Sequence, residues 1–402
     1  MTDTNRPIRT IGMISGTSFD GIDVAVVDVT ATPERVEIAV IGSDTYPYPE
    51  ELVAEIAAAL PPAKTTMEAV CRLDTRIGQA FAAAANRANH ELAEGRAELI
   101  GSHGQTMYHW VEGDRAMGTL QLGQPAWITE ATGLPVIADI RAADIAAGGH
   151  GAPLASTFDV MLLRGLEGGP RAALNLGGIA NATLVDAPEP LAYDIGPANA
   201  LIDIATQWAS DGAEHYDVGG ARALAGAVDD ALLKKLMDDD YYALGPPKST
   251  GKELFNGPYL KSALGAVPPV APNDIVATTT FHAACVVAED LARHGITEVV
   301  AAGGGVRNPV LMDALRSQLS PATRVVAMED YGVPSDTKES IFFAMFAALT
   351  AQGYSSTVPS ATGASGERSL GVIVPAAATP VGGQAVTFHR PRPERVVVAA
   401  AR

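Results

Sequence analysis

The sequence has few cysteines and few basic residues. Its 402 residues include two cysteines, Cys71 and Cys285, too few for a disulfide framework or a cysteine-rich zinc site. Both lie in helix-like apolar patterns, which favours buried free thiols. Lysine and arginine number 28 against 46 aspartate and glutamate residues, a net charge of -18. A nucleic-acid groove is basic, so this balance argues against nucleic acid as a partner, whereas ATP needs only local positive potential and Mg²⁺.

Long apolar runs are also missing. The apolar stretches are short or interrupted by glycine and charge, and none reaches the ~20 residues needed to cross a bilayer. Residues 1–6 are polar and carry no apolar signal-peptide core. These features predict a soluble cytoplasmic protein with no membrane partner. The length of 402 residues predicts two domains, because single domains usually run to ~100–200 residues.

A glycine-rich turn near the N-terminus is the most informative single feature. Residues 8–14 and 22–29 have strand patterns, and Gly16-Thr17-Ser18-Phe19-Asp20-Gly21-Ile22-Asp23 joins them into a hairpin. Glycine lets backbone N–H groups approach an anion, the hydroxyls add donors, and the two aspartates suit a hydrated Mg²⁺. The turn is therefore a candidate site for nucleotide phosphates. An ordinary polar turn is the alternative, since turns use the same residues.

The segments that follow predict a sheet covered by helices. Residues 35–42 have the pattern of a third strand, so the chain is expected to begin with an antiparallel meander at the edge of a sheet. Residues 50–60 and 66–93 have helical patterns, the second rich in alanine.

Two polar segments follow short predicted strands. The strand at 99–101 is expected to run into a small polar loop with His103, which either contacts a ligand or is hydrogen-bonded within the loop. Arg141 comes after a strand at 135–138 and either positions a hydroxyl or phosphate group or forms a structural pair with a nearby aspartate. The glycine cluster at 147–154 predicts a hinge or a substrate loop.

The second half of the chain repeats the architecture of the first. Residues 171–185 predict a strand, a turn at Gly177 and Gly178, and a second strand, and residues 191–199 predict a third strand that ends in an acid-glycine turn. Two halves that each open with such a hairpin predict an α/β protein. Each half would form one ribonuclease-H-like nucleotide-binding domain, with a cleft between the two. We place the first domain at residues 1–142 plus 350–402 and the second at 143–349.

A P-loop is excluded at residues 246–256. Pro246 stands at the first glycine position of the motif, and Glu253 follows Lys252 where serine or threonine is required.

A later glycine run has the right context for a nucleotide. The strand at 298–302 leads into Gly303-Gly304-Gly305, where a flat ring or ribose can lie against the backbone, although any turn from strand to helix favours glycine. Helices are expected at 310–319 and 336–350. The tail at 379–402 carries no functional signal.

In this order, the segments resemble the anhydro-N-acetylmuramic acid kinases of the sugar kinase, heat-shock ATPase and actin superfamily. The resemblance covers roughly residues 8–375. It implies two ribonuclease-H-like, actin-like ATPase domains with a nucleotide and sugar cleft between them. The matching segments are 12–18 with 20–23, 101–106, 138–141 with Asp144, 148–154, 175–181, 194–197, 246–256, 303–309 and 336–339.

The resemblance implies an enzyme that uses ATP and Mg²⁺ to open the 1,6-anhydro ring of anhydro-N-acetylmuramic acid and phosphorylate O6, giving N-acetylmuramic acid 6-phosphate and ADP. It implies that residues 16–23 cradle the phosphates and that Asp194 is the base that activates water. The alternative role for Asp194 is that of a structural carboxylate in a turn. Water attacks the anomeric carbon, the bridge breaks, and the departing O6 attacks the γ-phosphate. Such transfer depends mainly on positioning and charge stabilisation.

The predicted site residues fall into four groups. The catalytic residue is Asp194, and Asp20 and Asp23 hold the metal through water. The nucleotide-binding residues are Gly16, Thr17, Ser18, Phe19, Asp20, Gly21, Ile22, Asp23, Gly177, Gly178, Gly303, Gly304, Gly305 and Asn308. The substrate residues are His103, Gln105, Asp139, Arg141, Gly149 and Pro197.

Five positions depart from the usual family pattern. His150 stands where the family usually has Gln, Asp159 where it has His, and Gln124 where it has Asp. Ile195 and Ala198 stand where it usually has Thr and Gly. They leave the reaction type unchanged but do not settle which sugar is the substrate, and a neutral anhydrohexose such as levoglucosan is the alternative substrate.

A non-catalytic actin-like ATP-dependent sensor is the alternative from another functional class, and the retained aspartates weigh against it. Assembly as a homodimer is left open.

Overall fold

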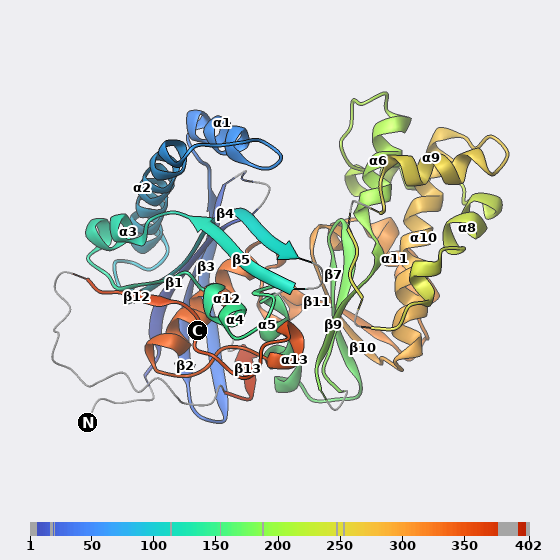
Figure 1. The fold of residues 1–402 in the computed structure, drawn as a ribbon. Helices are drawn as coiled ribbons and strands as arrows, with labels where there is room; N and C mark the ends of the chain where they lie inside the picture. Colours follow the sequence, from blue (N-terminus) through green and yellow to red (C-terminus); the bar gives the residue numbers. More distant parts are fainter. Residues whose placement is uncertain are drawn as a thin grey trace. The chain divides into compact units, whose positions relative to one another are not determined.

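The chain divides into two compact units in the computed structural model (Figure 1). The structure describes residues 6–16, 19, 21–112, 115–152, 154–186, 189–246, 248–251, 254–376 and 393–398. The first unit comprises Met1–Leu166 and Gly332–Arg402, and the second comprises Glu167–Tyr331.

The first unit is built on a mixed sheet with the order β12-β6-β4-β1-β2-β3-β13, and β5 pairs with β4 off this path. Strands β1, β2 and β3 form the predicted antiparallel meander, and β4 and β6 continue the sheet in parallel. The bounds are β1 (Ile8–Ser15), β2 (Ile22–Ala31), β3 (Arg35–Tyr46), β4 (Leu99–Glu112), β5 (Arg115–Leu122), β6 (Val136–Ala138), β12 (Val372–Val374) and β13 (Arg395–Val398).

Helices cover both faces of this sheet. Alternate residues of a strand point to opposite faces: Ile11 and Met13 of β1 belong to the core cluster that contains the apolar residues of α2, while Gly12 meets α12. Thr66 begins α2 by accepting a hydrogen bond from the N–H of Ala69 at 3.1 Å. The helices are α1 (Glu50–Ala59), α2 (Met67–Glu91), α3 (Pro125–Thr132), α4 (Ala142–Ala146), α5 (Ala155–Gly165), η5 (Ser335–Thr337), α12 (Lys338–Ala351) and α13 (Pro359–Thr362).

The second unit contains a sheet with the order β11-β10-β7-β8-β9. As in the first unit, three consecutive strands are antiparallel and the next two continue the sheet in parallel. The strands are β7 (Arg171–Leu176), β8 (Ile179–Leu184), β9 (Leu191–Pro197), β10 (Glu298–Ala302) and β11 (Arg324–Ala327). The helices are α6 (Asn199–Ala209), η1 (Val218–Gly220), α7 (Ala221–Ala225), α8 (Asp230–Met237), η2 (Asp240–Ala243), α9 (Gly257–Gly265), α10 (Pro272–Arg293), η3 (Gly304–Arg307), α11 (Pro309–Gln318) and η4 (Met328–Tyr331).

Helix α10 is the central helix of the second unit. Among the described residues it is the one helix long and apolar enough to span a membrane, yet 72% of that stretch is buried within the protein. Its side chains, among them Ala284, Val287 and Leu291, belong to the core cluster of this unit. The apolar character of α10 is therefore that of a core helix.

The same strand order occurs in both sheets. When β5, which lies off the main path, is left out and the strands are numbered by their order within each unit, both sheets contain the order 3-2-1-4-5. The strands are β3-β2-β1-β4-β6 in the first unit and β9-β8-β7-β10-β11 in the second. This is the ribonuclease-H-like arrangement, present twice. The predicted α/β fold with two actin-like domains is confirmed.

Several local features differ from the sequence-based prediction. The segment expected to be a polar loop around His103 is part of β4, because pairing with β1 on one side and β5 on the other satisfies its backbone. Strand β5 was not predicted, and neither was β13, which pairs with β3 in parallel within the otherwise uninformative tail.

The division into units also differs from the predicted boundaries at 142 and 349. Helix α5 packs on β13, where a Cβ on Gly165 would stand 2.0 Å from the carbonyl oxygen of Val396. Helix α12 packs on β1, β2 and β4. These contacts bring residues 143–166 and 332–349 into the first unit.

Candidate active site

The glycine turn after β1 is held by hydrogen bonds around Gly16. Its carbonyl oxygen accepts from the N–H of Phe19 at 3.2 Å and from Nε2 of Gln105 at 2.8 Å, and the hydroxyl of Ser15 donates to the carbonyl of Gly21 at 2.7 Å. A Cβ on Gly16 would have no described protein atom within 4 Å. Gly16 is therefore held in place, and no described atom fills the space beside it. Thr17, Ser18 and Asp20 lie outside the described residues.

The far end of this turn leads directly into β2. A Cβ on Gly21 would stand 2.8 Å from Cγ2 of Thr45, so this glycine lets the turn pack against β3. Ile22 is buried. Asp23 accepts a hydrogen bond at Oδ1 from the hydroxyl of Thr45 at 2.6 Å, which fixes the orientation of its carboxylate. Phe19 has a positive φ of 42°, which is uncommon outside glycine.

Gln105 supports this turn from within the sheet. Its side chain is fully buried, and its Nε2 donates to the carbonyls of Gly16 and Thr106, at 2.8 and 3.1 Å. Its Oε1 accepts from the hydroxyl of Tyr48 at 3.4 Å. The structure thus gives Gln105 a role in holding the glycine turn, and the predicted contact with substrate stays a prediction.

In the first unit, the buried His103 pairs with the half-buried Arg141. Nε of Arg141 donates to Nε2 of His103 at 2.7 Å, and Nη1 of Arg141 donates to the carbonyl of Gly151 at 2.7 Å. Burial and the charge of Arg141 lower the pKa of His103 to about 3, so the imidazole is neutral. Because Nε2 accepts, the ring proton lies on Nδ1, which is 3.1 Å from the carbonyl of Gly104. The guanidinium is therefore oriented by His103.

Asp144 organises the glycine loop beside this pair. Its carboxylate is completely buried and accepts from the N–H of Gly151 at 2.8 Å and from the hydroxyl of Thr362 at 2.7 Å. A Cβ on Gly149 would stand 2.3 Å from Oδ2 of Asp144, so only glycine fits there. Asp139 is exposed after β6 with a positive φ of 53°. Such backbone strain in a non-glycine residue often marks a functional site.

Glu339 is a candidate residue that the sequence did not single out. It lies in the first turn of α12, and part of its surface is exposed. Desolvation by surrounding atoms raises the pKa of Glu339, and the charges of Arg141 and Lys338 oppose that rise. Asp23 is the third charge that acts on Glu339, and it raises the pKa further. The sequence gave no local signal that Glu339 lies near Arg141 and Asp23. Glu339 comes near these residues only because α12 packs on the sheet.

Two of the departures from the family pattern have structural partners. Asp159 forms an ion pair with Lys338, with Oδ1 2.5 Å from Nζ, and both side chains are 9% exposed. Gln124 begins α3 and accepts from the N–H of Ala126 at 3.3 Å. These two residues therefore stabilise the first unit.

In the second unit, the turn between β7 and β8 is attached to the start of α6. The N–H groups of Ala198 and Ala200 donate to the carbonyl of Gly178 at 2.9 and 3.0 Å. Nδ2 of Asn199 donates to the carbonyl of Gly177 at 2.8 Å. Pro197, predicted to contact substrate, is buried at the end of β9 and paired with Ile179.

Asp194 lies in the edge strand β9 beside a β-bulge. Ala180 pairs with Gly196 and Asn181 with Asp194, so Ile195 is the extra residue. Bulges near active sites re-aim a side chain. The carboxylate accepts at Oδ2 from the hydroxyl of Ser249 at 2.8 Å and from the N–H of Thr250 at 3.0 Å.

The glycine run after β10 has one open position. Gly303 has φ 88°, and a Cβ there would stand 2.6 Å from Oδ1 of Asn175; a Cβ on Gly305 would stand 2.7 Å from Cβ of Leu176. Gly304 has no described atom within 4 Å of such a Cβ. Asn308 begins α11 by accepting at Oδ1 from two N–H groups, at 3.1 and 3.2 Å. The side-chain oxygen of Asn308 is thus used as a helix cap.

Within the described part of the chain, no group of three or more histidine, cysteine or acidic side chains is arranged to hold a metal ion. Mg²⁺ bound with a nucleotide usually uses one or two carboxylates, the phosphates and water. Asp23, a fixed oxygen donor at the glycine turn, has the chemistry for such a site.

The repeated strand order and the glycine turn that opens each unit define the class of the actin-like ATPases and sugar kinases. Comparisons with known proteins identify the family. The anhydro-N-acetylmuramic acid kinase family profile matches residues 8–376. An anhydro-N-acetylmuramic acid kinase of Streptomyces coelicolor is 50% identical over 370 residues, which cover 92% of this chain and 94% of that relative. One from Xanthomonas campestris is 40% identical over 384 residues, covering 93% and 99%.

Two solved structures are more distant. The first is the activator of the 2-hydroxyisocaproyl-CoA dehydratase from Clostridium difficile with bound ADPNP, with a TM-score of 0.38 and 12% identity over 85% of this chain and 94% of that chain. The second is a ROK family glucokinase from Streptomyces griseus in complex with glucose and AMPPNP, with a TM-score of 0.35 and 12% identity over 85% and 99%.

The chain belongs to the anhydro-N-acetylmuramic acid kinase family, because the family profile and the relatives span most of its length. It is an ATP-dependent sugar kinase of that family. Neither the levoglucosan alternative nor the non-catalytic sensor is supported by these comparisons.

Proposed function

We propose that this chain opens the 1,6-anhydro ring of anhydro-N-acetylmuramic acid with water and phosphorylates O6 from ATP, with Asp194 as the base. The observation that carries the proposal is the state of the Asp194 carboxylate. Oδ2 is held by two donors, and no described residue donates to Oδ1. A fixed carboxylate with one oxygen left to accept a proton has the geometry that a general base requires.

The reaction divides naturally between proton removal and phosphoryl transfer. Oδ1 of Asp194 takes a proton from water as water attacks the anomeric carbon, and the C1–O6 bond breaks. The released O6 then attacks the γ-phosphate, so ring opening supplies the acceptor alcohol and ADP leaves. The open space beside Gly16 and Gly304 supports assigning phosphates to the first and adenosine to the second.

Magnesium belongs to the same proposal. Asp23, together with Asp20, would hold the ion through water, and the ion would neutralise charge on the phosphates. The guanidinium of Arg141, oriented by His103, would contact the sugar or a phosphate oxygen.

The cellular setting follows from the cosubstrate. ATP is made and used in the cytoplasm, so we place the enzyme there, as the sequence predicts. Fractionation of cells that carry a tagged chain would test the location. Light scattering of the purified protein would test for a homodimer.

The test is an ADP-release assay with the Asp194→Asn variant. Asparagine keeps the size and removes the basicity, so we expect turnover to fall by about 10²–10⁴-fold with little change in ATP affinity. Rescue by excess Mg²⁺ would indicate a metal ligand instead. Near-normal turnover with lower thermal stability would indicate a turn residue and would refute the mechanism.

The substrate is tested by the same assay on the unaltered chain. Anhydro-N-acetylmuramic acid, levoglucosan and N-acetylmuramic acid are compared at equal concentrations. We expect the first to give the highest kcat/KM. Slow ADP release that does not depend on any anhydrosugar would contradict the assignment as a kinase of this substrate.

A further inference from the structure

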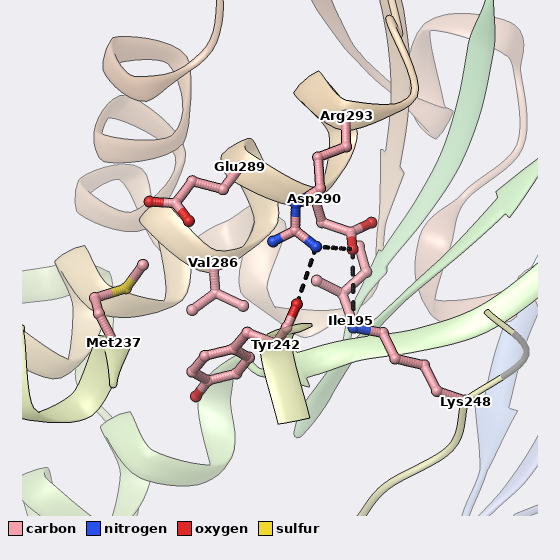
Figure 2. A pocket seen from close by; sticks show the side chains of 8 residues that line it. All are labelled: Ile195, Met237, Tyr242, Lys248, Val286, Glu289, Asp290 and Arg293. Carbon is pink, nitrogen blue, oxygen red and sulfur yellow. Dashed lines mark hydrogen bonds and ion pairs between the residues drawn. The ribbon is translucent and has the colours of Figure 1, made fainter. Parts of the chain in front are cut away.

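A buried lysine lies next to the segment that holds Asp194. The side chain of Lys248 is 3% exposed, and its Nζ makes no hydrogen bond to any described residue. Nζ lies 3.9 Å from Oδ1 of Asp290 on α10 and 4.8 Å from the centre of the Tyr241 ring. Burial lowers the pKa of Lys248, and the Asp290 carboxylate opposes that effect. Figure 2 shows the lysine side chain reaching toward Asp290 from a loop.

The partners of Asp290 make this an anchor rather than a ligand site. Its other carboxylate oxygen, Oδ2, accepts from the hydroxyl of Tyr193 at 2.5 Å, and Arg293 lies 3.8 Å from Oδ1. Arg293 also donates to the carbonyl of Tyr242 at 2.9 Å (Figure 2). The hollow between these side chains encloses about 190 Å³, open solvent included, and is too narrow to admit a water molecule. It therefore has no room for a small-molecule ligand.

Lys248 begins a three-residue segment, Lys248 to Thr250, that we call the clamp. The N–H of Asp194 donates to the carbonyl of Lys248 at 3.1 Å, so the clamp runs along the outer side of the edge strand β9. The next two residues, Ser249 and Thr250, both donate to Oδ2 of Asp194. The hydroxyl of Tyr241 donates to the Asp194 carbonyl at 2.8 Å.

The clamp supplies what an edge strand lacks. A residue in an edge strand has backbone groups without a strand partner, and a bulge loosens the ladder further. Asp194 has both conditions. The contacts to the clamp fix its backbone N–H and one carboxylate oxygen, and the Lys248 ammonium group ties the clamp to the core helix α10.

We propose that Ser249 is a positioning residue for the base, and that Lys248 anchors the clamp that carries it. This inference rests on the proposed function of Asp194. With Oδ2 held by Ser249 and Thr250, Oδ1 is the oxygen that accepts the proton. Loss of the Ser249 hydroxyl leaves one donor on Oδ2 and lets the carboxylate rotate out of the productive orientation. Small misplacements of reacting groups reduce rates by up to ~10²-fold.

The test is a double-mutant cycle with Asp194→Asn. Ser249→Ala is measured in the unaltered chain and in the Asp194→Asn background, with enough enzyme to quantify the slow variant. We expect kcat to fall about tenfold or more in the first and to change by less than about twofold in the second, because Ser249 acts through the carboxylate. KM for ATP is expected to stay constant. Ser249→Thr keeps the hydroxyl and should restore most of the rate.

A matched control removes a serine hydroxyl elsewhere in the same unit. Ser317 lies on α11, where its hydroxyl donates to the carbonyl of Ala314, so Ser317→Ala should leave kcat unchanged. Equal losses from Ser249→Ala in both backgrounds, or a rate within about twofold of normal in the unaltered chain, would overturn the positioning role. No anhydrosugar-dependent ADP release from the unaltered chain would instead refute the proposed function.

The anchor is tested in the same cycle. Lys248→Met keeps an apolar side chain of similar length and removes the charge. We expect a fall in kcat in the unaltered chain and little further loss in the Asp194→Asn background. A loss of equal size in both backgrounds would show that Lys248 does not act through Asp194 and would overturn its part of the proposal.

Discussion

Replacing Gly12 by alanine tests how the first unit is held together. Gly12 lies in the middle of β1, and a Cβ there would stand 1.9 Å from the carbonyl oxygen of Ser340 and 2.5 Å from the backbone nitrogen of Ala344. Both atoms belong to the backbone of α12, which is buried throughout most of its length. Gly12 has no positive φ, so the substitution adds a packing conflict without backbone strain.

The size of the effect follows from the distances. Contacts of a Cβ below 3.0 Å are essentially never seen, so the strand and the helix must separate by about 1 Å, and no side-chain rotation can relieve the overlap. Overpacking a core costs about 1–3 kcal/mol and occasionally more. Because backbone meets backbone here, we expect about 3 kcal/mol. For a unit of this size that lowers Tm by roughly 6–12 °C.

The assay is thermal unfolding followed by circular dichroism, with Gly16→Val as the matched control. Gly16 also lacks a positive φ, and its Cβ would meet no described atom, so Tm should change by less than about 2 °C. ATP affinity of that variant should fall at least tenfold, because the side chain would occupy the space assigned to phosphate. A Tm for Gly12→Ala within about 2 °C of the unaltered protein would refute the packing argument. Unchanged ATP affinity in Gly16→Val would refute the phosphate site.

Three further outcomes are expected. Burial is the main cause that lowers the pKa of His103 to about 3 and the pKa of His282 to about 4. From about pH 6.5 down to these folded-state pKa values, the unfolded chain therefore binds protons that the folded chain does not. Stability should therefore decrease as the pH is lowered through that window, and His103→Gln, which keeps an acceptor for Arg141, should flatten the decrease measured by urea unfolding. Asp290→Asn leaves the Lys248 ammonium group buried without its anion and should lower the free energy of unfolding by about 3 kcal/mol. Asp238→Asn, which breaks an exposed pair with Lys235, should change it by less than about 1 kcal/mol; equal effects would contradict the burial argument. Chelation of Mg²⁺ should abolish ADP release and Mg²⁺ should restore it, whereas full activity in chelator would exclude a metal-dependent transfer.

The sequence alone was sufficient for features that depend on near neighbours. The strand patterns on either side of the two glycine turns predicted both meanders, because strand periodicity and turn chemistry are local properties. The order of the segments was enough to recognise the family. Asp194 was singled out by the family resemblance and not by its local pattern, since the acid-glycine turn predicted around it is part of strand β9. The site assignments themselves stay predictions until the variants are measured.

Other features depended on contacts between distant parts of the chain. His103 looked like a loop residue, but pairing of β4 with β1 and β5 buries it and makes it an acceptor for Arg141, 38 residues away. The hydroxyl that donates to Asp194 belongs to Ser249, 55 residues away. The sequence excluded a P-loop in that segment and matched it to the family, but it gave Ser249 no role.

The tertiary structure also decided why particular glycines are needed. Gly12 reads like any glycine in a strand, and only the approach of α12, more than 300 residues later in the chain, shows that a methyl group would not fit. A glycine in a turn and a glycine under a helix look alike in sequence, because a steric limit is set by the atoms that pack against a residue and not by its neighbours along the chain. The sequence therefore determined which elements form and where glycine occurs, and packing determined which polar groups are buried, paired and oriented.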